Sequence, residues 1–228
     1  ISVPVAYGET FDNDYYAIGI RHDGLGVKLT DESTSMGRNS AFDGTESGGV
    51  TTGVTGKIDS YAWSFDGSDD YVTTGLTQNL GQQFSIGFWA QFENINGWSS
   101  GAMMGKGISD GDEEFIAYLQ GSSKIGGEAI HDRSMTSNTV PVASTWYHIF
   151  YTIDGDAGEY KVYVDGQLDG TETSTRTNNY TETAFVIGWS HLAGGGWGNG
   201  SFDGLLDQVL VYDDVLTETE VQALWNNG

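Results

Sequence analysis

The run Asp112-Glu113-Glu114 is the acidic cluster that comes nearest to a catalytic pair. Retaining glycoside hydrolysis requires two carboxyl groups about 5 to 5.5 Å apart, one as nucleophile and one as acid. Consecutive residues of a strand point to opposite faces, and the preceding Ser109-Asp110-Gly111 is typical of a loop. The run is therefore a poor match to hydrolase chemistry.

His131-Asp132-Arg133 is a compact candidate for a lyase site. Such a site needs a Tyr or His base and an Arg or Asn that neutralises a uronate. A surface hairpin explains the same residues equally well. A formal net charge of −23, from 32 acidic and 9 basic residues, would also repel an anionic polysaccharide. A polysaccharide hydrolase or lyase involving Asp112, Glu113 or His131 is thus kept as an alternative function.

Asp207 is a candidate metal ligand. It would share a strand face with Leu205, Val209 and Val211. A carboxylate in such company needs a cation or backbone N–H partners. Calcium binds carboxylate and carbonyl oxygens, and Asp-Gly turns supply both. We therefore expect Asp207 either to bind a structural calcium ion or to accept main-chain hydrogen bonds.

Two tryptophans in loop-like stretches are candidates for sugar recognition. Trp98 lies in Asn96–Ser100 and Trp197 in Gly194–Asn199. A flat aromatic ring stacks on the C–H face of a sugar while polar neighbours bind its hydroxyls. Trp98 could instead cap the edge of a sandwich, and Trp189 fits either role. The others, in strand or helix patterns, are expected in the core: Trp63, Trp89, Trp146 and Trp225.

Alternating sequences predict the strands that would position these residues. In Phe84–Phe92 every second residue is apolar, and Trp146–Ile153 carries bulky groups on both faces, as in a central sandwich strand. Tyr160–Val164 follows the turn-rich Asp154–Gly158, which predicts a hairpin.

One helix is expected near the end of the sequence. Thr217–Glu220 forms a capping box, and Leu216 can pack on Val221. We expect the face formed by Val221, Leu224 and Trp225 to pack on the edge of the sandwich.

The composition predicts an all-β protein. The 228 residues include 34 Gly, 2 Pro, no Cys and 13% aromatic residues, which is typical of strands joined by tight turns. No repeat or linker divides the chain, so residues 1–228 are predicted to form one domain, with 1–15 as a linker or an extra edge strand. No stretch approaches the roughly 20 apolar residues of a membrane span. The scarcity of Lys and Arg argues against a nucleic-acid partner, and the acidity favours adaptation to high salt or abundant divalent cations.

Six fragments follow one another along the chain: Leu29–Thr45, Ser64–Val72, Phe84–Trp89, Thr145–His148, Val162–Gly166 and Phe202–Tyr212. In this order they resemble the laminin-G-like jelly-roll family of the concanavalin A-like lectin and glucanase superfamily. This resemblance implies a two-sheet antiparallel jelly-roll sandwich with a short C-terminal helix. Members include lectins, carbohydrate-binding modules, adhesion domains, hydrolases and lyases, so function must be argued from the site.

The resemblance also implies where calcium and ligand would bind. The position of Asp207 resembles that of an Asp in the last strand of related glucanases, which binds calcium together with main-chain carbonyls. Pentraxin-like relatives hold a ligand-side calcium with an acidic pair that aligns with Asp110 and either Asp112 or Glu113, but here His191 stands among the residues that replace the later acidic ligands. Three further aspartates could bind a local ion, although the resemblance suggests that they stabilise a turn: Asp66, Asp69 and Asp70.

These observations favour a non-catalytic recognition or adhesion module that is extracellular, at a cell or virion surface. It would bind glycan or glycoprotein through Trp98, Trp197 and nearby loops, and calcium would stabilise it. A structural subunit of an appendage or virion, which associates with copies of itself, is a third possibility.

Overall fold

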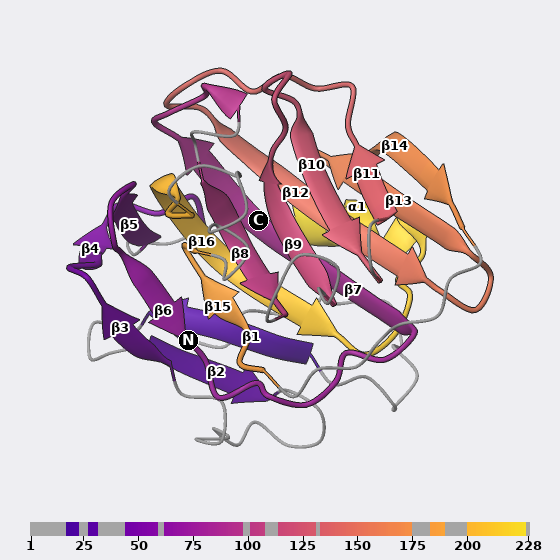
Figure 1. The fold of residues 1–228 in the computed structure, drawn as a ribbon, viewed down its shortest axis with the longest axis horizontal. Coiled ribbons are helices and arrows are strands. Elements are labelled where there is room, and N and C mark those ends of the chain that lie inside the picture. The colour runs from indigo at the N-terminus through magenta and orange to yellow at the C-terminus, as the bar shows by residue number, and fades with distance from the viewer. Residues whose placement is uncertain are drawn as a thin grey trace.

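The computed structural model describes residues 17–22, 27–31, 44–58, 62–97, 101–107, 114–130, 133–174, 183–189 and 200–226, with only the backbone of 17–22, 27–31 and 133. Within them the chain forms a sandwich of two antiparallel sheets and one short helix, which confirms the predicted fold class (Figure 1).

The large sheet has nine strands. Seven follow the order β14 (Gln167–Thr173), β13 (Glu159–Val164), β12 (Trp146–Asp154), β7 (Gln83–Phe92), β16 (Asp203–Tyr212), β1 (Ala17–His22) and β2 (Val27–Asp31). Two more are β5 (Ala62–Asp66), which pairs with β16, and β4 (Thr51–Val54), which pairs with β5.

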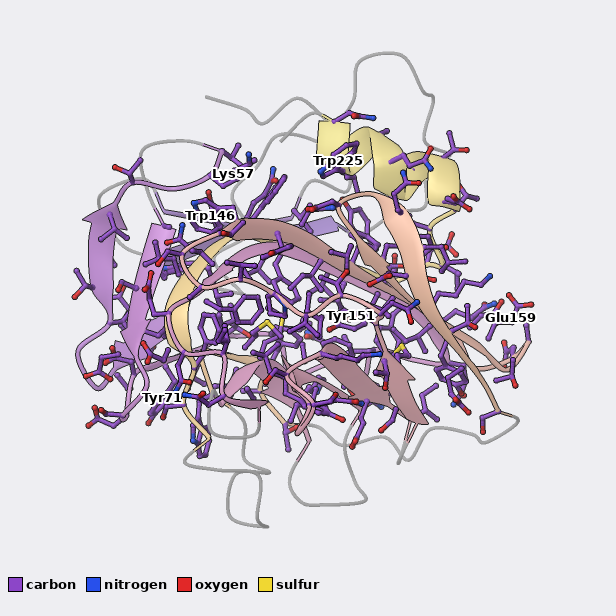
Figure 2. All side chains as sticks on the ribbon, turned by 90° about the horizontal axis from the view of Figure 1, so that it is seen from above. Lys57, Tyr71, Trp146, Tyr151, Glu159 and Trp225 are labelled. Carbon is purple, nitrogen blue, oxygen red and sulfur yellow. The ribbon has the colours of Figure 1, made fainter. Side chains whose placement is uncertain are left out.

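The small sheet has seven strands in the order β11 (Arg133–Thr136), β10 (Ile125–Ala129), β9 (Phe115–Leu119), β8 (Ala102–Lys106), β15 (Val186–Ile187), β6 (Tyr71–Thr73) and β3 (Thr45–Ser47). The side chains of one face of each sheet fill the space between them (Figure 2).

The alternation in β7 builds the middle of the core. Its inward residues are fully buried and belong to one apolar cluster, as the sequence predicts: Phe84, Ile86, Phe88, Ala90 and Phe92. The core side of β12 carries Ile149, Tyr151 and Ile153, whereas Phe150 is buried in a second cluster on the other face. The prediction of a central strand with two covered faces is confirmed.

The hairpins join these strands as expected. β12 pairs with β13 through the 154–158 turn, and β13 pairs with β14 through Asp165-Gly166. Both residues of this second turn have positive φ, 50° and 72°, which suits the right-handed twist of the flanking strands. Not every Asp-Gly pair forms a turn, because Asp203-Gly204 lies inside β16, where a side chain on Gly204 would overlap the carbonyl of Gln91.

A β-bulge in β16 changes the side on which Asp207 lies. The register shifts between Asp207 and Leu210, and Gln208 adopts a positive φ of 47°. Leu206 and Val209 both face the core, whereas Asp207 lies on the outer face of the large sheet. The expectation that Asp207 shares a face with Val209 and Val211 is therefore wrong, because simple alternation ignores the bulge.

Helix α1 (Glu218–Asn226) begins at the predicted capping box. The Thr217 N–H donates to Glu220 Oε2 over 2.7 Å, and the Glu220 N–H donates back to Thr217 Oγ1 over 3.4 Å. Leu216 and Val221 pack with Tyr212 in one buried apolar cluster. The helix lies over the outer face of the large sheet (Figure 2). The helix also contacts the edge strand β14, which agrees with the expected packing on the sandwich edge. Among the described helical residues, no segment is long and apolar enough to cross a membrane.

Candidate functional site

The turn between β5 and β6 gathers three carboxylates. Asp70 Oδ2 accepts a hydrogen bond from the Asp66 N–H over 3.0 Å, and Asp66 Oδ1 accepts one from the Ser68 N–H over 2.8 Å. One carboxylate oxygen each of Asp66, Asp69 and Asp70 lies within 4.8 Å of the others. We call residues 66–70 the acidic turn. Its carboxylates could hold a metal ion, since hard cations prefer such oxygens.

Negative charge is concentrated around this turn. Burial raises the pKa of Asp70 above its ordinary value; the charges of Asp66 and Asp69 raise it further, against a lowering by the hydrogen bond from Asp66. Asp203 pairs with Asp66 across the sheet, and burial followed by the charges of Glu93 and Asp66 raises its pKa as well. In the described part of the chain, none of these carboxylates forms an ion pair with a basic side chain.

The described ends of two loops meet at the acidic turn. Ala102 follows the segment that carries Trp98, and its N–H donates to the Gly200 carbonyl over 3.3 Å, directly after the segment that carries Trp197. Ser201 Oγ donates to the Ser68 carbonyl over 2.8 Å. We call this end of the sandwich the acidic rim. Trp98 and Trp197 themselves lie outside the described residues, but the roots of both segments converge here.

The contact between the two roots is very close. Gly101 has a positive φ of 72°, and a Cβ at this position would overlap the carbonyl of Ser201. Ala102 and Ser201 form a β-bridge, and the Gly67 N–H donates to the Phe202 carbonyl over 3.0 Å. Backbone contacts therefore tie both roots and the acidic turn into one unit.

Two aromatic rings border the acidic rim. Tyr71 directly follows the acidic turn, and its ring centroid lies 5.6 Å from that of Trp189 at an interplanar angle of 35°. Both side chains are half-buried. Trp189, for which the sequence left both a core and a surface role open, is thus paired with a tyrosine at the rim.

The segment that carries the predicted acidic pair begins and ends at the other end of β8. Asp110, Asp112 and Glu113 lie outside the described residues, between Lys106 and Glu114, whose backbones are joined by a 2.9 Å hydrogen bond. β8 runs from Ala102 at the acidic rim to Lys106, a rise of roughly 13 Å at about 3.3 Å per residue. The roots of this segment are therefore not part of the acidic rim.

Comparison with known families identifies the fold. A laminin-G-type family model, described as the concanavalin A-like lectin/glucanases superfamily, matches residues 66–222, more than half of the chain. The chain belongs to this superfamily. No curated protein matches it in sequence.

Three solved structures resemble this superfamily member. Domain 4 of AbnA, an extracellular GH43 arabinanase from Geobacillus stearothermophilus in complex with arabinotriose, gives a TM-score of 0.64 at 18% identity over 92% of this chain and 98% of that domain. The binding domain of botulinum neurotoxin DC in complex with rat synaptotagmin II gives 0.66 at 13% identity, covering 94% and 52%. The binding domain of Paraclostridial Mosquitocidal Protein 1 gives 0.61 at 16% identity, also covering 94% and 52%.

The chain spans about half the length of the two toxin binding domains. At these identities the likeness shows the fold alone. The superfamily includes glucanases as well as lectins, so membership does not settle whether this chain is an enzyme.

Asp207 of this laminin-G-type sandwich has main-chain partners. Its Oδ2 accepts hydrogen bonds from the N–H groups of Lys57 and Ile58 over 2.8 and 2.9 Å, and its side chain is buried. The Lys57 ammonium lies 4.8 Å from the ring centre of Trp89, the cross-strand neighbour of Asp207. Main-chain hydrogen bonds, one of the two expected solutions, are therefore present, and calcium at Asp207 stays a prediction.

His148 is buried on the same outer face. Its ring centroid lies 5.1 Å from that of Trp89, and its backbone N–H donates to Asp165 Oδ1 over 2.9 Å. The ring Nδ1 has no hydrogen-bond partner among the described atoms. Burial lowers the pKa of His148 to about 3, so the ring is neutral at physiological pH.

A buried polar network on the small sheet escaped the sequence analysis. Glu128 Oε1 accepts hydrogen bonds from the Tyr118 hydroxyl over 2.6 Å and from Ser134 Oγ over 2.9 Å. Tyr118 faces away from the core, and burial, followed by the charge of Glu128, raises its pKa well above the ordinary value. The one signal was a glutamate inside the otherwise apolar stretch Ile125–Ala129.

His191, the remaining residue predicted at the ligand site, lies outside the described residues.

Proposed function

We propose that this chain is a non-catalytic extracellular recognition or adhesion module that binds glycan or glycoprotein at the acidic rim. The observation that carries the proposal is the convergence of the Trp98 and Trp197 loop roots on the acidic turn. Two segments that each offer a tryptophan start from one rigid point. A ligand placed there would meet aromatic rings and hydrogen-bond acceptors together.

Calcium is the proposed cofactor at this rim. The carboxylates of the acidic turn lie within 4.8 Å of one another, and no described basic side chain neutralises them. A divalent cation would relieve this repulsion and hold the turn in place. Asp207 remains a second proposed site, although its two main-chain hydrogen bonds already stabilise the carboxylate.

Structural relatives support a binding role outside the cell. The AbnA domain comes from an extracellular enzyme and was solved with an oligosaccharide, whereas the neurotoxin domain was solved with a protein receptor. Both kinds of partner are compatible with this chain. We favour glycan, because tryptophans beside carboxylates suit a ring that bears hydroxyls.

A glycan and glycoprotein array tests the proposal. The wild-type protein is probed in high salt with calcium and with chelator, beside Trp98→Ala and Trp197→Ala. Trp146→Ala is the matched control, since this half-buried tryptophan lies on the other sheet, far from Tyr71 (Figure 2). We expect the two rim variants to lose binding and the control to keep it. Binding that neither rim substitution changes would contradict the proposal.

One observation favours the enzyme alternative. The Ile130 N–H donates to the Glu114 carbonyl over 3.2 Å, which places the root of the segment with His131 beside that of the segment with Asp112 and Glu113. Glu128 lies two residues from this contact. Reducing-sugar release, or an unsaturated lyase product, that disappears in Asp112→Asn, Glu113→Gln or His131→Asn would establish this alternative. No turnover across a broad polysaccharide panel would retire it.

A further inference from the structure

Tyr71 and Trp189 project from the outer face of the small sheet. Val72, the next residue after Tyr71, and Ile187, two residues before Trp189, belong to the core between the sheets, whereas neither ring does. The positive φ of Gly188 turns the chain between Ile187 and Trp189. In Figure 2, Tyr71 lies on the opposite side of the molecule from Trp146. The two rings are therefore not needed to fill the interior, and each keeps part of its surface in solvent.

The backbone around Trp189 is held firmly. Gly188 has a positive φ of 81°, and a Cβ there would overlap the Phe65 ring, so the chain changes direction where only glycine is accommodated. The Gly188 N–H donates to the Met103 carbonyl over 2.7 Å, and its carbonyl accepts from the Phe202 N–H over 2.8 Å. The ring is thus presented from a rigid position, which reduces the entropy lost on binding.

The aromatic pair is connected to the acidic turn. Trp189 forms a β-bridge with Ser201, and Ser201 Oγ donates to the Ser68 carbonyl. Tyr71 is joined directly to Asp70 through the chain. The two rings therefore lie beside the acidic turn, in which Asp66 and Asp69 are exposed and Asp70 is buried.

This arrangement suits one chemical class of ligand. Two rings inclined at 35° offer apolar surface to the C–H face of a pyranose or furanose, and the adjacent carboxylates accept hydrogen bonds from its hydroxyls. Because four aspartates and Glu93 gather at the rim, it would stay negative with one calcium ion bound and would repel a uronate or sulfated sugar. Resting on the proposed function, we propose that Tyr71 and Trp189 form the stacking platform for one neutral sugar unit of the ligand.

The test compares ring removal with ring retention. Neutral oligosaccharides are assayed by microcalorimetry against wild type, Tyr71→Ala, Tyr71→Phe and Trp189→Ala. Loss of a stacked ring should weaken binding about tenfold, whereas Tyr71→Phe, which keeps the ring, should stay within about twofold. Leu168→Ala, an exposed position on the edge strand β14 of the large sheet, is the control. Circular dichroism and melting temperature confirm that each variant folds.

The outcomes separate this inference from the proposed function. If wild type binds a neutral sugar and Trp98→Ala loses it while Tyr71→Ala and Trp189→Ala do not, the platform is wrong and the rim site stands. If wild type binds no saccharide in the panel, both proposals for glycan fail. A uronate-containing or sulfated oligosaccharide that binds as tightly as a neutral one of equal length would overturn the charge selection.

Discussion

The two ends of β8 treat negative charge in opposite ways. At the far end the Glu114 carboxylate is fully buried, and the Lys106 ammonium lies 3.5 Å away, also fully buried. At the acidic rim, four aspartates and Glu93 gather with no described cation. One end is neutralised within the protein, whereas the other leaves its charge for something from outside. The difference indicates which end is built for stability and which for contact.

The Lys106–Glu114 pair also fastens neighbouring segments. Lys106 Nζ donates to the carbonyls of Thr77 and Thr183, and Glu114 Oε2 accepts from the Leu80 N–H over 3.3 Å. Each charge thus has several partners, as buried ions require. The carboxylates of the acidic rim have no such set of charged partners among the described residues, and the rim is held mainly by contacts between backbone groups.

The largest expected effect comes from removing the lysine of the buried Lys106–Glu114 pair. Lys106→Met leaves Glu114 buried without a counter-charge and should lower the free energy of unfolding by about 3 to 5 kcal/mol. Urea denaturation measures this change. The double variant Lys106→Met/Glu114→Leu should recover most of the loss, because no buried charge is left unpaired. A single variant as stable as wild type would remove the contrast between the two ends.

Calcium should stabilise the protein chiefly through the acidic rim, because the carboxylates there have no described cation beside them. At a concentration about one hundred times its Kd, calcium should raise the free energy of unfolding by about 2.7 kcal/mol. Asp69→Asn should abolish that gain, since it removes one of three clustered carboxylates. Asp156→Asn, at an exposed hairpin beyond the far end of β12, is the matched control and should respond as wild type. Equal calcium responses in both variants would place the ion elsewhere.

Acid titration should show a smaller, graded effect. The pKa of His148 is about 3 in the folded protein and about 6.5 in the unfolded chain. Below pH 6.5 the imidazole therefore binds a proton in the unfolded chain but stays neutral in the folded protein. At pH 5.5 the free energy of unfolding should therefore be roughly 1.4 kcal/mol lower than well above pH 6.5. Thermal melts of wild type and His148→Phe measure this difference.

The same titration sharpens the comparison of the two ends. Asp70 and Asp203 have raised pKa values, so protonation as pH falls through those values relieves repulsion and stabilises the fold. With His148 removed, stability without calcium should therefore rise on mild acidification. A continued decline would show that repulsion at the rim is weak.

Regular features of the fold were predictable from local pattern. The alternation in β7 depends only on which residues are apolar, and the capping box of α1 only on Thr217 and Glu220. The bulge at Gln208 was not predictable, because its positive φ reflects pairing with β7 and not a local preference of glutamine. That one irregularity moved Asp207 to the outer face.

The candidate site was predictable only in part. Trp98 and Trp197 stand out by their Gly- and Asn-rich surroundings, yet the bases of their two segments meet through Ala102 and Ser201, which are 99 positions apart. Tyr71 carried no signal, since a tyrosine in a strand is expected anywhere in such a sandwich. Glu128 was overlooked because its partner Tyr118 comes from a neighbouring strand.

Gly101 and Ser201 hold the bases of two loop segments together, so the sequences of these segments can vary while their attachment to the sheets stays the same. The two segments are joined at their bases by main-chain contacts that do not depend on what the intervening residues are. Their tips can then be lengthened, shortened or exchanged by grafting without disturbing the sheets below, as in other scaffolds that carry variable loops. Such a base would let one sandwich diversify into binders of many specificities.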